Sequence, residues 1–184
     1  MCGIAGYLGK KIITKKTIEA AITSLNHRGP DNSQYYIDLN KTNNILLIHN
    51  RLSILDLEER SNQPFYFKNY VLVFNGEIYN YIEVKEILTK LGHQFYTQSD
   101  TEVLAHALFE WGEEALKKLE GMWSFAWYNK YTNELFLSRD RFGEKPLFFL
   151  KTEEGIYFAS EIKAIIALIG FKLDLNMQHI FRYL

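Results

Sequence analysis

The only cysteine of this 184-residue chain lies at position 2, directly after the initiator methionine. Once Met1 is removed, Cys2 carries both a thiol and a free α-amine, whose ordinary pKa values are about 8.5 and about 7.7–8.0. The amine can then take the proton of the thiol at neutral pH, directly or through a water, without a histidine. This pairing predicts an N-terminal cysteine nucleophile. A cysteine that follows the start site by chance is the alternative, because one residue is not a motif.

The dipeptide Asn75-Gly76 is a second candidate for chemistry. It follows a continuous apolar run of strand length, residues 70–74, which we expect to be buried on both faces. Glycine lets the backbone approach a ligand and offers its N–H, and the asparagine amide supplies a second donor. Two such donors are what an oxyanion hole for acyl transfer requires. An ordinary turn is the alternative, since Asn-Gly is common in turns.

Charged residues outside charged runs are candidates for substrate binding. Arg28 and Arg51 stand among apolar or loop-forming residues, and arginine binds carboxylates through two parallel hydrogen bonds. A structural loop arginine is the alternative, more so for Arg28 than for Arg51. Asp100 stands at the predicted start of a helix, where an N-cap is the simplest role. It accepts from a substrate ammonium instead if that helix end faces the site.

The composition excludes several classes of protein. A net charge of −1 gives no reason to expect nucleic acid or an anionic membrane as a partner. One cysteine excludes a disulfide framework, and the five histidines show no metal-ligand spacing, so we expect no metal. No apolar run approaches the ~18 residues of a membrane span, and lysines from Lys10 onward interrupt any signal-peptide core. These features favour a cytoplasmic protein of one domain.

Hydrophobic periodicity predicts strands toward both ends of the chain, on either side of central helices. The predicted strands are 4–8, 33–39, 43–49, 70–74, 93–96, 122–128, 134–139, 146–151 and 156–159. The predicted helices are 18–25, 78–91, 101–111, 113–119 and 161–168, the last capped by Ser160. The simplest architecture is α+β, with two stacked, mostly antiparallel sheets covered by helices on the outside.

Together, these features resemble the N-terminal glutaminase domain of class II glutamine amidotransferases, in the branch of the glutamine-hydrolysing asparagine synthetases. The matching segments run in family order over nearly the whole chain. They are Met1–Gly6, His27–Asp31, Arg51–Asp56, Asn75–Asn80, Ser99–Glu102, Leu119–Met122, Arg139–Gly143, Lys145–Leu147 and Ala159–Glu161. Within the class, Arg28–Asp31 and Arg51–Ile54 indicate the asparagine synthetase branch.

The resemblance implies an N-terminal nucleophile hydrolase fold, a four-layer αββα sandwich, and the hydrolysis of L-glutamine to L-glutamate and ammonia. It implies that Cys2 attacks the side-chain amide while its α-amine serves as base and later as acid. Asn75 and the N–H of Gly76 would stabilise the oxyanion.

The same resemblance implies how the substrate is bound. Arg51 would hold the α-carboxylate, helped by the backbone of Leu52, Ser53, Ile54 and Leu55. Glu77 and Asp100 would receive the α-ammonium, and Arg28 would line or close the pocket.

The family continues into an ATP-dependent synthetase domain with a Ser-Gly-Gly-x-Asp-Ser loop, which this chain lacks. We therefore expect residues 1–184 to be the glutaminase domain alone, without a cofactor, since ATP and Mg²⁺ would belong to the synthetase domain. The expected partners are L-glutamine and a C-terminal or separate synthetase domain, and a homo-oligomer is left open. Residues 122–125 and 143–146 differ from the commoner family versions, which leaves the ammonia acceptor open between aspartate and another carboxylate such as a sugar acid.

Two other functions remain open at this stage. An N-terminal nucleophile amidase acting on a different amide would share the cysteine chemistry, although Arg51, Glu77 and Asp100 suit a zwitterionic amino acid. A non-catalytic regulatory domain that keeps the fold would retain Met1 and release no ammonia.

Overall fold

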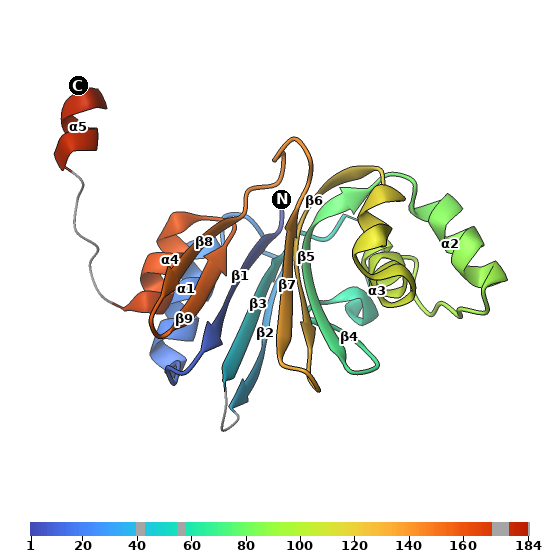
Figure 1. Cartoon of the computed structure of the whole chain (residues 1–184), viewed down its shortest axis with the longest axis horizontal. Coiled ribbons are helices and arrows are strands. Elements are labelled where there is room, and N and C mark those ends of the chain that lie inside the picture. Colours follow the sequence, from blue (N-terminus) through green and yellow to red (C-terminus); the bar gives the residue numbers. More distant parts are fainter. Residues whose placement is uncertain (40–42, 55–57, 171–176, 184) are drawn as a thin grey trace.

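The computed structural model describes residues 1–39, 43–54, 58–170 and 177–183. Within these residues the strands form two antiparallel sheets (Figure 1). The first sheet has the order β2-β3-β1-β9-β8 and the second the order β4-β5-β6-β7. The strands are β1 (Gly3–Gly9), β2 (Asn32–Leu39), β3 (Asn44–Arg51), β4 (Phe65–Phe67), β5 (Tyr70–Ile78), β6 (Gly121–Asn129), β7 (Glu134–Arg139), β8 (Phe148–Thr152) and β9 (Gly155–Ala159). The helices are α1 (Lys15–Leu25), α2 (Tyr81–Lys90), α3 (Asp100–Trp111), α4 (Ile162–Ile169) and α5 (Met177–Tyr183), with short 3₁₀ helices η1 (Glu59–Ser61) and η2 (Gly112–Lys117).

The two sheets stack face to face, with helices on the outer face of each (Figure 1). Helices α1 and α4 pack on the first sheet in one apolar cluster that includes Leu25 and Leu168. Helices α2 and α3 pack on the second sheet in another, which includes Leu88 and Leu104. A third cluster fills the space between the sheets with side chains from β1, β3, β5, β6 and β9. This arrangement confirms the predicted α+β class and the four-layer αββα sandwich.

Strand β1 lies in the middle of the first sheet, between β3 and β9. Its alternate residues face opposite layers, because successive side chains of a strand point to opposite faces. Ile4 belongs to the cluster between the sheets, whereas Ala5 and Tyr7 belong to the cluster under α1 and α4. Both faces of β1 are buried and both its edges are paired, so its backbone is firmly held. Cys2 directly precedes this strand, which restricts where Cys2 can lie.

Several predicted elements differ from the structure at their ends. Strand β5 continues to Ile78, so α2 begins at Tyr81 rather than at the predicted residue 78. Residues 93–96 form no strand; Glu102 accepts instead from the N–H groups of Tyr96 and Thr97. The predicted helix 113–119 is the 3₁₀ helix η2. The three-residue strand β4 was not predicted, because its only sequence signal is a short aromatic run.

The two predicted helix caps are each displaced by one residue. Ser99, not Asp100, caps α3, and its side chain accepts from the N–H of Thr101. Glu161, not Ser160, occupies the N-cap position of α4, because the hydroxyl of Ser160 accepts from Ile4 instead. No helix in the described part of the chain is long and apolar enough to cross a membrane.

Candidate active site

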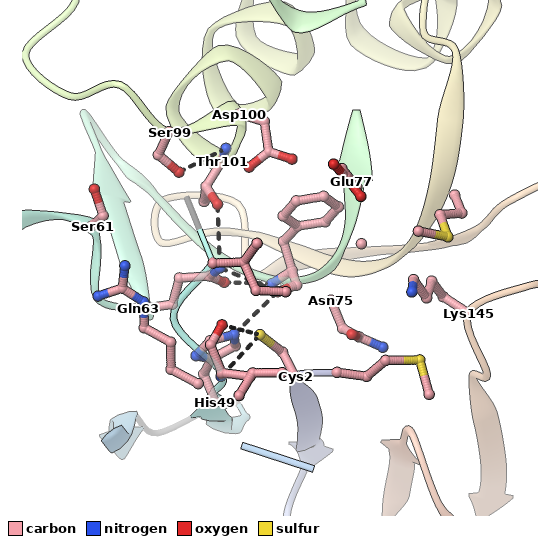
Figure 2. A pocket seen from close by; sticks show the side chains of 17 residues that line it. Cys2, His49, Ser61, Gln63, Asn75, Glu77, Ser99, Asp100, Thr101 and Lys145 are labelled. Carbon is pink, nitrogen blue, oxygen red and sulfur yellow. Dashed lines mark hydrogen bonds between the residues drawn. The ribbon is translucent and has the colours of Figure 1, made fainter. Parts of the chain in front are cut away.

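A pocket of about 270 Å³ lies where β1, β3 and β5 meet the N-terminus of α3 (Figure 2). It joins residues that are far apart in the sequence, from the start of the chain to the loop before β8. The lining residues are Met1, Cys2, His49, Arg51, Leu52, Ile54, Ser61, Gln63, Phe74, Asn75, Gly76, Glu77, Ser99, Asp100, Thr101, Met122 and Lys145. Eight of the residues predicted for the site therefore lie around one cavity: Cys2, Arg51, Leu52, Ile54, Asn75, Gly76, Glu77 and Asp100.

The sulfur of Cys2 lies close to both polar backbone groups of Leu52, the N–H and the carbonyl. The Leu52 N–H donates to Sγ at 3.4 Å, and Sγ lies 3.6 Å from the Leu52 carbonyl oxygen. Burial raises the pKa of the Cys2 thiol, against the lowering effects of the Leu52 bond and of the positive charges of the N-terminus and Arg51. A thiol with a raised pKa needs a base to become a nucleophile at neutral pH. Met1 is exposed, and while it is present the nitrogen of Cys2 is part of a peptide bond.

Asn75 and Gly76 lie within strand β5 rather than in a turn, which excludes the turn alternative. The Asn75 amide nitrogen donates to the hydroxyl of Ser124 at 3.4 Å, and Figure 2 shows this side chain close to Cys2. Gly76 lies against β6 so closely that an added Cβ would lie 2.3 Å from the carbonyl oxygen of Met122. Only glycine fits there without a shift of the backbone.

Gln63 fixes the backbone that leads into Asn75, and sequence reasoning missed it. Its Oε1 accepts from the Phe74 N–H at 2.6 Å, and its Nε2 donates to the Phe74 carbonyl at 3.1 Å. The same nitrogen donates to the hydroxyl of Thr101 at 3.3 Å, which links β5 to α3. The sequence carries no signal for this role, since a glutamine before a proline in a polar loop is unremarkable.

His49 also lines the pocket, but its environment keeps it neutral. Burial lowers the pKa of His49 to about 3, with a further lowering from the Arg51 charge. Its Nε2 lies 3.1 Å from the Phe74 carbonyl oxygen, so this nitrogen carries the proton and donates. A histidine with so low a pKa is a poor base at neutral pH.

The charges of the pocket are of both signs. Arg51 is buried, and its Nη1 donates to the side-chain oxygen of Asn62 at 2.6 Å and to the Glu58 carbonyl at 3.2 Å. Glu77 and Asp100 lie on one side of the pocket (Figure 2). Burial, together with the Glu77 charge, raises the pKa of Asp100 to about 6, although the Ile78 N–H donates to its Oδ2 at 3.0 Å. This half of the site therefore favours a cation.

Two residues predicted for the site do not line the pocket, and a third is not among the residues that the structure describes. Arg28, expected to line or close the pocket, does not line it; it lies behind Cys2 and donates from Nε to the Cys2 carbonyl at 2.9 Å. Ser53 is not a lining residue either, and its N–H donates to Asp31. Leu55 lies outside the described residues. Among the residues described, no group of three or more histidine, cysteine or acidic side chains is placed to hold a metal ion.

Comparison with known proteins agrees with this geometry. All 184 residues match the model of the glutamine amidotransferase domain family, from residue 1 to residue 184. The chain belongs to this family. This amidotransferase domain is 38% identical over 174 residues to asparagine synthetase 3 (glutamine-hydrolysing) of Bacillus subtilis, which covers 91% of the chain and 28% of that protein. It is 35% identical over 203 residues to the putative asparagine synthetase 2 of Methanocaldococcus jannaschii, covering 100% of the chain and 39% of that protein.

Solved structures share the fold of the amidotransferase domain. The glutamine phosphoribosylpyrophosphate amidotransferase of B. subtilis superposes with a TM-score of 0.74 at 21% identity, over 92% of this chain and 44% of that one. A second structure, described as the allosteric regulatory enzyme of purine biosynthesis, gives a TM-score of 0.75 at 22% identity, over 91% of this chain and 43% of that one. These neighbours confirm the predicted N-terminal nucleophile hydrolase fold.

Proposed function

We propose that this domain hydrolyses L-glutamine to L-glutamate and ammonia, with Cys2 as nucleophile once Met1 has been removed. One observation carries the proposal: the Cys2 thiol shares a pocket with a buried arginine and a pair of carboxylates. A thiol suits attack on an amide, and charges of both signs suit the α-carboxylate and α-ammonium of an amino acid.

The α-amine of Cys2 is the base in this proposal. His49 lines the pocket, but with a pKa of about 3 it does not take the thiol proton at neutral pH. Asp100 has a pKa of about 6, but its Oδ2 accepts from the Ile78 N–H and we assign it to the substrate ammonium. The amine is on the same residue as the thiol, and its ordinary pKa of about 7.7–8.0 suits proton exchange near neutrality.

The reaction proceeds in two halves. The amine takes the Sγ proton, and the thiolate attacks the side-chain amide carbon to give a tetrahedral oxyanion. Asn75 and the Gly76 N–H donate to that oxyanion, and each such donor is worth about 3 kcal/mol in a well-formed site. The protonated α-amine of Cys2 then gives its proton to the amide nitrogen as the C–N bond breaks, so that ammonia leaves and a thioester remains. Water, deprotonated by the amine, attacks the thioester and releases glutamate and the thiol.

Substrate recognition follows from the charges around the pocket. Arg51 binds the α-carboxylate, beside the backbone of Leu52. Glu77 and Asp100 bind the α-ammonium. A simple amide lacks both charges, so the competing proposal of an amidase for some other amide leaves these three side chains without a role.

In the parent protein, we propose that the ammonia passes to an ATP-dependent synthetase region that amidates an activated carboxylate. The chain spans 28% and 26% of the two B. subtilis relatives and 39% of the M. jannaschii relative, so most of each relative lies outside this domain. Those relatives are named asparagine synthetases, which favours aspartate as the acceptor over a sugar acid. The domain itself needs no cofactor in this proposal, and ATP and Mg²⁺ belong to the synthetase region.

The test is ammonia release from glutamine by the purified domain, with intact-mass measurement to establish that Met1 is absent. Cys2→Ala should abolish ammonia release while glutamine binding, measured by calorimetry, remains. Asparagine and acetamide should be poor substrates and poor competitors. Retained Met1 together with full activity would refute the mechanism, and equal hydrolysis of acetamide would favour the alternative amidase.

A further inference from the structure

The junction between β9 and α4 holds the first residues of the chain, although about 155 residues separate the two segments. The Ile4 N–H donates to the hydroxyl of Ser160 at 3.0 Å, and the Ser160 N–H donates to the Ile4 carbonyl at 2.8 Å. Ser160 is fully buried, so both bonds are shielded from water. The next residue, Glu161, therefore has a fixed position relative to the start of β1.

The carboxylate of Glu161 interacts with three basic side chains. Its Oε1 accepts from Arg28 Nη1 at 3.1 Å and lies 2.8 Å from His27 Nε2, while Oε2 lies 3.1 Å from the Lys163 ammonium. Partial burial alone would raise the pKa of Glu161, but the bonds from Lys163, His27 and Arg28 lower it to about 2. Glu161 is therefore ionised at neutral pH.

Arg28 links this carboxylate to the nucleophile. Its side chain is 8% exposed, one end donates to Glu161, and its Nε donates to the Cys2 carbonyl at 2.9 Å. The stem of Arg28 also lies against Gly3, where an added Cβ would lie 3.4 Å from Cδ. The guanidinium is thus held at two points, and its orientation fixes the peptide that follows Cys2.

We propose that Glu161 is a positioning residue for the nucleophile and acts through Arg28. The inference rests on the proposed function, because it concerns the same cysteine. Without Met1, Cys2 is joined to the fold by one peptide bond, the Arg28 bond to its carbonyl and the Leu52 contacts to its sulfur. Loss of Glu161 frees the guanidinium, and Cys2 then samples positions away from the substrate carbon. Small displacements of a reacting group lower the rate strongly, since catalysis depends on near-attack geometry.

The test uses Glu161→Ala, with Lys163→Ala as a matched control. Lys163→Ala removes another partner of the Glu161 carboxylate but leaves the bonds of Arg28 to Glu161 and to the Cys2 carbonyl in place. In Glu161→Ala, kcat for glutamine should fall about tenfold while KM stays within about twofold. Alkylation of Cys2 by iodoacetamide should accelerate severalfold, because a displaced thiol is less buried and its pKa falls. Lys163→Ala should leave both rates within about twofold, and Glu161→Gln, which can still accept from Arg28, should recover most of kcat.

Four outcomes would decide against the inference. Equal losses in kcat for Glu161→Ala and Lys163→Ala, or a thermal midpoint lowered so far that the variant is partly unfolded at the assay temperature, would make Glu161 a residue of stability only. In the double variant with Arg28→Ala, the losses should not multiply; a multiplicative loss would also overturn it. If the unaltered domain releases no ammonia, the proposed function fails, and the alkylation rates alone still test the positioning: equal rates in Glu161→Ala and the parent refute it.

Discussion

Glutamine binding should weaken as the pH falls from 7 to 5, because Asp100 loses its charge in that range. Burial and the neighbouring Glu77 charge raise the pKa of Asp100 to about 6 in the free domain. With that pKa, about nine-tenths of the Asp100 carboxyl groups are ionised at pH 7 and about one-tenth at pH 5. A bound α-ammonium favours the ionised form, so the pKa falls on binding. The dissociation constant should therefore rise about tenfold between pH 7 and pH 5, or about 1.4 kcal/mol.

The assay is calorimetry of glutamine binding to the Cys2→Ala variant, which removes the reaction. The amino and carboxyl groups of glutamine do not titrate between pH 5 and pH 7, and His49, with a pKa of about 3, stays neutral there. Binding at pH 6 should release about half a proton per site, seen as a dependence of the measured heat on the buffer.

Asp100→Asn is the control for this prediction. It should bind glutamine more weakly at pH 7 and show an almost flat dependence between pH 5 and pH 7. Two results would refute the assignment of Asp100 to the substrate ammonium. One is a dissociation constant that does not change over this pH range when Asp100 is present. The other is an Asp100→Asn variant whose dissociation constant changes with pH as much as that of the domain with Asp100.

Three other substitutions test the site. Arg51→Ala should raise KM for glutamine on the order of a hundredfold, because a buried partner of the α-carboxylate is lost; an unchanged KM would remove Arg51 from that role. Gly76→Ala should lower the thermal midpoint, with a loss of about 1–3 kcal/mol in the free energy of unfolding, because its Cβ would lie 2.3 Å from the Met122 carbonyl oxygen. It should also lower kcat. A thermal midpoint and a kcat equal to those of the unaltered domain would contradict the tight packing against β6. Gln63→Leu should lower stability by about 1–3 kcal/mol, because the buried Phe74 N–H loses its acceptor. The exposed Gln94→Leu is its matched control and should change stability by less than about 0.5 kcal/mol.

The site residues that sequence reasoning found are those whose chemistry shows in the chain itself. Cys2 directly follows the first methionine, Asn75-Gly76 follows a buried apolar run, Arg51 is a charge outside any charged run, and Asp100 stands at the start of a predicted helix. The layers were predictable for a similar reason: period-2 and period-3.6 patterns record burial, and burial decides the layers.

The residues that sequence reasoning missed act through geometry that only the folded chain creates. Gln63 matters because its amide meets both polar groups of Phe74, and nothing in its local sequence indicates that meeting. The resemblance implies that Arg28 lines or closes the pocket, whereas in the structure its guanidinium donates to a carboxylate of the protein itself, that of Glu161. Hydrophobic periodicity predicts a strand at residues 93–96, whereas in the structure the Glu102 carboxylate accepts from the N–H groups of Tyr96 and Thr97.

The central place of β1 has a consequence for how the enzyme is made. The strand pairs with β3 on one side and with β9 on the other, as in the pair Ala5 and Ala159. Synthesis proceeds from the N-terminus, so β1 cannot pair with β9 until residues 155–159 have been made. Until then the hydrogen bonds of Ile4 to Ser160 and of Arg28 to Glu161 cannot form. Cys2 is therefore among the last residues of this domain to reach its working position, although it stands near the start of the chain. A nascent or truncated domain that ends before β9 should therefore expose a thiol without being a glutaminase.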